Sequence, residues 1–199
     1  MAVWEFVVNY LHKNPIELLG AVLTVICVWL NTQQNPWGWL VGILGIICYL
    51  WVFYQVRLVG DFLLNIYFLL TSLYGWYHWR YGKGNMKKLP ISRLSLPKLM
   101  TYVIAGLVLG VIFGEILARY TSASVPRWDA IATTFSVIAQ WLLAKKKVES
   151  WGFWIFVNVI YVGIFLVQEL FATMLVYAIL LALAIKGYWQ WKLELISNN

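Results

Sequence analysis

The sequence contains little charge. Asp, Glu, Lys and Arg make up only 12% of its 199 residues, whereas hydrophobic residues make up 62% and the mean hydropathy is +0.75. A soluble domain of this size needs more polar groups to cover its surface, so the composition predicts an integral membrane protein. The apolar runs are helical in length and do not alternate in ten-residue strands, which excludes an outer-membrane barrel.

Groups that carry out chemistry are equally scarce. There is no Walker motif for ATP hydrolysis and no Ser–His or Cys–His pattern for a nucleophile. The two histidines, His12 and His78, lie near the ends of apolar segments with no second ligand at metal spacing. Cys27 and Cys48 lie inside apolar runs and are typical of inert core residues. We therefore expect no enzyme activity, no cofactor and no metal.

No carboxylate lies clearly in the middle of an apolar segment. Asp61, Glu115, Asp129 and Glu169 all fall near segment ends. An intramembrane carboxylate is a common carrier of coupling protons or sodium ions. Its absence argues against a process coupled to a proton or sodium gradient. A proton-coupled symporter remains an alternative, with Asp61 as the nearest candidate.

Seven apolar segments predict an all-α integral membrane protein with seven transmembrane helices. Their expected ranges are Ile16–Leu30, Trp37–Tyr54, Leu58–Trp79, Leu99–Leu117, Trp128–Ala144, Trp151–Val167 and Leu170–Trp189. Ahead of them, Val3–Leu11 predicts a short interfacial helix. The N-terminus lacks the basic region and the small-residue cleavage site of a secretory signal, so we expect no removable signal peptide.

Lys and Arg are distributed unevenly between the two ends of these segments. Eleven of the fifteen fall on one side: Arg80, Lys83, Lys87, Lys88, Arg93, Lys98, Lys145, Lys146, Lys147, Lys186 and Lys192. The other side carries Lys13, Arg57, Arg119 and Arg127. The positive-inside rule then places the N-terminus outside and the C-terminus in the cytoplasm. The net charge of +7 is explained by this topology, and we expect no nucleic-acid partner.

Short motifs of the first half recur in the second half. The recurring pairs are TVICVWL at Thr24–Leu30 with SVIAQWL at Ser136–Leu142, WGW at Trp37 with WGF at Trp151, and GWYHWR at Gly75 with GYWQWK at Gly187. The separation is the same for the first and third pairs and slightly longer for the second. We therefore expect one transmembrane domain, 1–199, with three-helix repeats at 16–79 and 128–189 and a central linker helix at 99–117. One intervening span makes the repeats parallel, in a 3+1+3 arrangement.

The central segment carries Gly106, Gly110 and Gly114, one glycine every four residues. This spacing lets another helix approach closely. It is compatible with a scaffold between the halves, with a contact between subunits, or with ordinary packing inside one chain.

Trp151, Trp154 and Asn158 form the pattern W-x-x-W-x-x-x-N, and their spacing places all three on one helical face. Two indoles offer flat stacking surfaces, and the amide offers two donors and an acceptor. This combination suits a ligand with an aromatic ring and several hydroxyls. An interfacial aromatic belt is the alternative, chiefly for Trp151.

Two further amides lie inside predicted spans. Gln140 shares a face with Thr133 and Ser136, and Asn65 shares a face with Ser72. The hydroxyls can bond to a carbonyl one turn back, but an amide in hydrocarbon needs other partners. Gln140 and Asn65 are therefore candidates either for ligand contact or for hydrogen bonds between helices.

The two repeats differ at these positions. Val28 of the first repeat corresponds to Gln140, and in the alignment that pairs Trp37 with Trp151, Leu40 and Leu44 correspond to Trp154 and Asn158. We therefore expect an asymmetric site built mainly by the second repeat.

Two long stretches resemble the Pnu family of vitamin transporters, particularly its nicotinamide riboside members. They are WGWLVGILGIICYLWVFYQVRLVGDFLLNIYFLLTSLYGWYHW at 37–79 and WDAIATTFSVIAQWLLAKKKVESWGFWIFVNVIYV at 128–162. The resemblance implies a bacterial inner-membrane protein with seven spans in a 3+1+3 arrangement similar to SWEET sugar transporters, and a homotrimer. It also implies a facilitator whose substrate is trapped inside by phosphorylation.

By the same resemblance, the substrate-binding residues are Trp151, Trp154 and Asn158, followed by Gln140 and Asn65. Position 65 is Asn where nicotinamide riboside members are expected to carry Gln, so thiamine, riboflavin or a deoxynucleoside is the alternative substrate. The leading hypothesis is uptake of nicotinamide riboside for NAD biosynthesis by uniport with alternating access. A non-transporting membrane scaffold is a more distant alternative.

Overall fold

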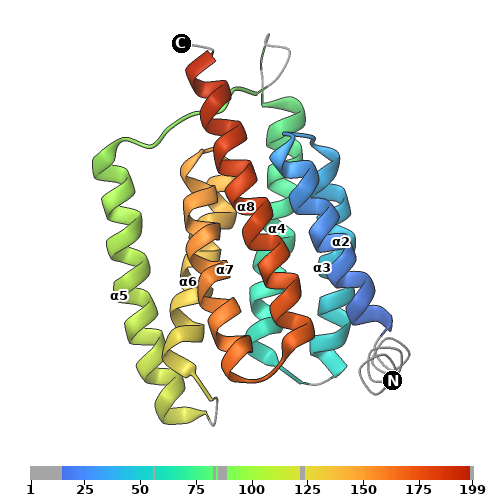
Figure 1. Cartoon of the computed structure of the whole chain (residues 1–199), viewed down its shortest axis with the longest axis vertical. Coiled ribbons are helices and arrows are strands. Elements are labelled where there is room, and N and C mark those ends of the chain that lie inside the picture. The colour runs from blue at the N-terminus through green and yellow to red at the C-terminus, as the bar shows by residue number, and fades with distance from the viewer. Residues whose placement is uncertain (1–14, 56, 83, 85–88, 122–123, 198–199) are drawn as a thin grey trace.

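The computed structural model describes residues 15–55, 57–82, 84, 89–121 and 124–197. Within these residues the chain forms seven α-helices (Figure 1). They are α2 (Pro15–Thr32), α3 (Trp37–Gln55), α4 (Val59–Tyr81), α5 (Leu96–Tyr120), α6 (Pro126–Ala144), α7 (Glu149–Val167) and α8 (Phe171–Ser197). The all-helical prediction is confirmed. The expected interfacial helix at Val3–Leu11 lies outside the described residues.

The helices run alternately up and down one bundle (Figure 1). Most ends lie within three residues of the predicted ones. The largest difference is α8, which continues beyond Trp189 to Ser197. The prediction ended this helix at its aromatic residues, whereas the backbone stays helical beyond the apolar region.

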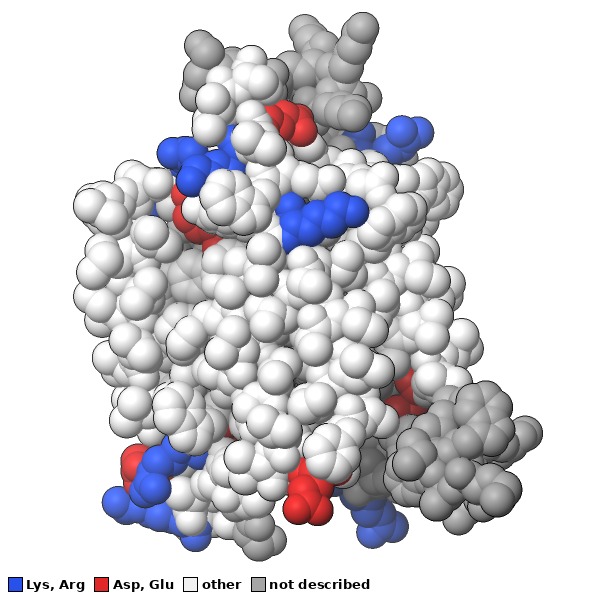
Figure 2. Space-filling model, in the orientation of Figure 1, with Lys and Arg blue, Asp and Glu red and all other residues white. Residues whose placement is uncertain are grey.

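Five of the seven helices, α2, α3, α5, α7 and α8, are long and apolar enough to span a membrane individually. The other two, α4 and α6, have 23 and 19 residues and carry more polar side chains. Figure 2 shows the Lys, Arg, Asp and Glu side chains near the two ends of the bundle, with an uncharged band between them. This distribution is that of a multi-pass membrane protein.

Six helices close into a ring. The packed neighbours are α2 with α3, α3 with α4, α4 with α6, α6 with α7, α7 with α8, and α8 with α2. The remaining helix, α5, packs on α6 and lies at the edge of the bundle (Figure 1). The polar helices α4 and α6 are direct neighbours in this ring.

The glycines of α5 are used in packing against α6. A Cβ atom would lie 2.9 Å from a Phe135 ring carbon at Gly106 and 2.9 Å from Thr134 Oγ1 at Gly110. At Gly114 it would lie 3.0 Å from the Arg127 Cα. The three-glycine face is therefore an intramolecular contact, which is one of the three alternatives that the sequence left open.

The geometry of the first half recurs in the second half at one fixed separation along the chain. Helix α3 begins at Trp37 and ends at Gln55, and α7 begins and ends at the equivalent positions, Glu149 and Val167. Among the described residues, the four non-glycine residues with positive φ form two pairs at the same separation, Gln34 (58°) with Lys146 (55°) and Arg57 (56°) with Glu169 (60°). We call this correspondence the Trp39–Trp151 register, because it pairs those two residues.

The register expected from WGW and WGF is therefore wrong for this pair of helices. Trp151 corresponds to Trp39 and not to Trp37. The residues of α3 equivalent to Trp154 and Asn158 are accordingly Gly42 and Ile46 instead of Leu40 and Leu44. The similarity of WGW and WGF suggested a register that is two residues off. The helix ends and the residues with positive φ define the register that the structure has.

Matching tryptophan pairs support this register. Trp39 meets Trp79 edge to face at 5.3 Å, and Trp151 meets Trp191 in the same way at 5.4 Å. The Trp79 indole N–H donates to the carbonyls of Leu143 and Ala144 at the end of α6, while that of Trp191 donates to the Thr32 carbonyl at the end of α2. We call α2–α4 the first group of helices and α6–α8 the second group. Each indole thereby caps the end of a helix that belongs to the other group.

Candidate functional site

Trp154 of α7 lies on the inner side of the ring. Its half-buried indole contacts the Phe68 ring of α4, with ring centroids 6.4 Å apart and planes inclined by 54°. Helices α4 and α7 are not packed neighbours, since α6 lies between them and α5 covers the outer side of α6. The Phe68–Trp154 contact therefore crosses the inner side of α6. Two aromatic faces at this place can hold a planar ring.

Asn158 follows Trp154 by about one helical turn. Its side chain is 3% exposed. No hydrogen bond joins its amide to another residue in the described part of the chain, and its nitrogen and oxygen are not among the fully enclosed polar atoms that lack a partner. Two donors and an acceptor are therefore unused at this place. A ligand hydroxyl or carboxamide can form hydrogen bonds with them.

The other two predicted amides lie on α6 and α4. Gln140 Nε2 donates to Ser72 Oγ at 3.2 Å, which joins α6 to α4. Asn65 is 8% exposed, and its Nδ2 donates to the Asp61 carbonyl at 3.0 Å, one turn back in its own helix. Gln140 thus links two helices, while Asn65 keeps its side-chain carbonyl oxygen as an acceptor.

Trp151 has a different environment from Trp154. It is 1% exposed, and a Cβ at Gly187 of α8 would lie 2.7 Å from its ring. Together with its edge-to-face contact on Trp191, this makes Trp151 part of the packing between α7 and α8. Its indole N–H is buried and has no hydrogen-bond partner among the residues that the structure describes, as is also true of the equivalent Trp39.

The structure therefore brings Trp154, Gln140 and Ser72 together with a residue that sequence reasoning missed, Phe68. The signal for Phe68 was present, because Asn65, Phe68 and Ser72 follow one another at steps of three and four residues and share a helical face. Phe68 was overlooked because an apolar aromatic in a transmembrane helix carries no polarity that marks it as inward-facing.

The carboxylates of Asp61 and Asp129 lie at the end of the ring opposite to the tryptophan pairs. Asp61 and Asp129 belong to the first turns of α4 and α6, and Tyr161 Oη donates to Asp129 Oδ1 at 3.4 Å. Within the described residues, no three His, Cys, Asp or Glu side chains are placed to hold a metal ion.

Comparisons with known proteins agree with a transporter. Residues 14–193 match the family described as nicotinamide mononucleotide transporter. The nicotinamide riboside transporter PnuC of Escherichia coli strain K12 is 28% identical over 201 residues, covering 88% of this chain and 84% of that protein. The riboflavin/roseoflavin transporter RibM of Streptomyces davaonensis is 26% identical, covering 95% of this chain and 90% of that protein.

A solved structure shares the fold. The crystal structure of the vitamin B3 transporter PnuC matches with a TM-score of 0.77 at 20% identity, over 100% of this chain and 89% of that one. The family match covers most of the chain, and five helices long and apolar enough to span a membrane agree with it. The chain therefore belongs to the nicotinamide mononucleotide transporter family, whose members are membrane transporters and not enzymes.

Proposed function

We propose that this protein carries nicotinamide riboside into the cell by facilitated diffusion. The observation that carries the proposal is the Phe68–Trp154 pair on the inner side of the ring, one turn from the Asn158 amide, which makes no hydrogen bond to another described residue. Relatives of this chain named nicotinamide riboside transporter PnuC cover most of its length. We place the protein in a bacterial inner membrane, with the N-terminus outside and the C-terminus in the cytoplasm.

The chemistry of the substrate fits these groups. Nicotinamide riboside has a cationic pyridinium ring, a carboxamide and a ribose. Indole and phenyl faces attract a cationic ring without a counter-charge. The amides of Asn158, Gln140 and Asn65 can then bond to the ribose hydroxyls or to the carboxamide. Trp151 supports Trp154 from one turn away, within the packing between α7 and α8.

We further propose that α2–α4 and α6–α8 are two parallel copies of one unit. Their contacts and backbone geometry correspond in the Trp39–Trp151 register, and the two groups meet through α2 with α8 and α4 with α6. Relative movement of the two copies would open the site alternately to each side. Such a uniporter needs no coupling ion. Three copies of the chain assemble as a homotrimer.

Uptake into proteoliposomes containing only this protein tests the function. We expect saturable uptake of labelled nicotinamide riboside that excess unlabelled substrate abolishes. Protein-free vesicles measure the leak. Uptake no faster than this leak, from a correctly folded and reconstituted protein, would reject the proposal.

A second substrate class is favoured by one comparison. The riboflavin/roseoflavin transporter RibM covers 95% of this chain at 26% identity, close to the 28% of the Escherichia coli relative. Riboflavin is likewise a planar ring with a polyhydroxyl chain, so the same aromatic and amide groups would suit it. Competition decides between them: riboflavin that blocks uptake at lower concentration than unlabelled nicotinamide riboside would move the assignment to flavins.

A further inference from the structure

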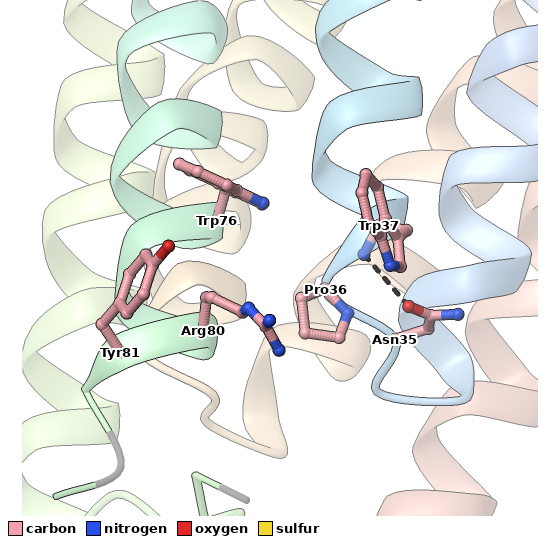
Figure 3. Close-up of a pocket in the computed structure, with 6 residues that line it drawn as sticks. All are labelled: Asn35, Pro36, Trp37, Trp76, Arg80 and Tyr81. Atoms are coloured by element: carbon pink, nitrogen blue, oxygen red, sulfur yellow. Dashed lines mark hydrogen bonds between the residues drawn. The ribbon is translucent and has the colours of Figure 1, made fainter.

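A cavity of about 320 Å³ lies at the end of the bundle where α3 begins and α4 ends, apart from the site described above. Six residues line it: Asn35, Pro36, Trp37, Trp76, Arg80 and Tyr81. Figure 3 shows Trp37 and Asn35 on one side, Trp76 and Tyr81 on the other, and the Arg80 side chain extending toward Pro36.

This cavity opens on the outer surface of the bundle. Trp37 is 67% exposed and Tyr81 is 57% exposed, whereas Trp39, two residues further along α3, is 1% exposed and faces inward. Trp76 and Tyr81 meet edge to face at 6.0 Å. Exposed Trp and Tyr at the end of a transmembrane helix are typical of the level of the lipid headgroups.

Two strong hydrogen-bond donors of the cavity remain available, one on Arg80 and one on Asn35. Arg80 is exposed, and the one ion pair formed among the described residues joins Arg127 to Glu115, away from this cavity. The Asn35 side-chain oxygen already accepts the Trp37 backbone N–H at 3.0 Å, which leaves the Asn35 NH₂ group to donate. A guanidinium and an amide NH₂ without acceptors suit a phosphate.

The equivalent place in the second group of helices is covered by the chain itself. In the Trp39–Trp151 register, Asn35 corresponds to Lys147 and Trp37 to Glu149. Lys147 pairs with Ser92 of the segment between α4 and α5, and Glu149 Oε2 accepts the Leu94 N–H at 3.1 Å. In the described structure no such segment covers Asn35 and Trp37. The first group therefore exposes a surface that the second group closes.

We propose that this cavity binds the headgroup of an anionic phospholipid, with the phosphate held by Arg80 and Asn35. A volume of about 320 Å³ is at the lower end of the range for small-molecule pockets. It suits a headgroup, while the acyl chains lie on the apolar outer surface beside Trp37. Basic pockets between transmembrane helices are places where anionic headgroups bind. The proposal does not depend on which substrate the protein carries.

Native mass spectrometry of the purified protein tests this site. The wild type, Arg80→Gln and Lys192→Gln are each titrated with phosphatidylglycerol and with phosphatidylcholine. Lys192 is the matched control, because it occupies the position equivalent to Arg80 and lies over the rings of Tyr188 and Trp189. We expect Arg80→Gln to weaken the first phosphatidylglycerol binding step about tenfold, as loss of a charge-assisted hydrogen bond implies. Lys192→Gln and phosphatidylcholine binding should change less than twofold.

A second variant, Trp37→Ala, changes the cavity without changing its charge. Trp37→Ala removes an exposed ring and should also weaken phosphatidylglycerol binding without lowering the thermal unfolding midpoint. Equal weakening by Arg80→Gln and Lys192→Gln would reveal diffuse surface charge and overturn the proposal. Displacement of the lipid by millimolar inorganic phosphate would assign the cavity to a soluble anion. A changed number of chains per complex in Arg80→Gln would assign it to a second copy; either result rejects a lipid site.

Discussion

At the scale of single residues, the proposed substrate site combines two kinds of side chain. One is an aromatic ring that contacts another ring, and the other is an amide that makes no hydrogen bond to a described residue. Trp154 touches Phe68 across the inner side of α6, while Asn158 is 3% exposed and its amide makes no hydrogen bond to another described residue. The first group gives a stacking surface, and the second gives donors and an acceptor that folding leaves unused. The two substitutions below separate these contributions.

Trp154→Ala removes the larger stacking surface. We expect the concentration of nicotinamide riboside that gives half-maximal uptake to rise about tenfold or more, since an aromatic contact with a desolvated cation contributes about 2 kcal/mol. Trp189→Ala is the control, because Trp189 is 55% exposed on the outer surface. Initial rates of labelled uptake measure both variants. Unchanged half-saturation in Trp154→Ala would show that Trp154 does not meet the substrate.

Asn158→Leu exchanges the buried amide for an apolar side chain of similar size. The free energy of unfolding should stay within about 1 kcal/mol of the wild type, because no hydrogen bond to a described residue is lost. Substrate binding should weaken about tenfold through lost hydrogen bonds. Thermal unfolding in detergent and quenching of Trp fluorescence measure the two effects. A destabilised protein that binds normally would assign Asn158 to structure alone.

At the scale of elements, glycines set how closely the helices approach. Gly75 of α4 lies against the Trp39 ring and Gly187 of α8 against the Trp151 ring, and a Cβ at either would lie 2.7 Å from a ring carbon. Trp79 and Trp191, which contact these two rings, donate their indole N–H groups to carbonyls at the ends of α6 and α2 in the other group of helices. The close approach of α3 to α4 and of α7 to α8 is therefore tied to the contact between the two halves.

Gly187→Ala should lower the free energy of unfolding by about 1–3 kcal/mol, because the added methyl group displaces the buried Trp151 ring. Gly163→Ala in α7 is the control, since a Cβ there meets nothing within 4 Å. That change should be neutral or stabilising by up to about 1 kcal/mol through helix propensity. Unfolding midpoints in one detergent measure both. Equal midpoints for both variants would contradict the close packing of α8 on Trp151.

At the scale of the whole molecule, an uncharged band separates the two charged ends of the bundle (Figure 2). The carboxylates Asp61 and Asp129 lie in the first turns of α4 and α6. A uniporter of this kind moves a cationic substrate together with its charge. Membrane potential, and not a proton gradient, should then drive accumulation.

An inside-negative potential of about 100 mV contributes about 2.3 kcal/mol per charge. This predicts accumulation of nicotinamide riboside by about fiftyfold. Potassium-loaded proteoliposomes treated with valinomycin provide the potential, and a pH step without potential provides the control. Accumulation that follows the pH step and disappears in Asp61→Asn would replace uniport by proton symport.

Much of this fold follows from the sequence. Long apolar runs separated by short polar segments predict helices with ends accurate to a few residues, because the spanning requirement fixes both their length and their composition. The recurrence of TVICVWL and SVIAQWL indicates the relation between the two groups. The polar members of the proposed site, Asn158, Gln140 and Asn65, stand out in the sequence because amides inside apolar helices are rare.

The sequence by itself determined that this chain is a helical membrane protein, where its helices lie and which polar groups are unusual. Only the tertiary structure decided that Trp151 corresponds to Trp39, that Phe68 faces Trp154, and that the glycines of α5 pack on α6. The physical reason is that lipid is as apolar as the interior of the bundle. Hydrophobicity therefore marks a helix as spanning, but it does not mark which of its faces turns inward.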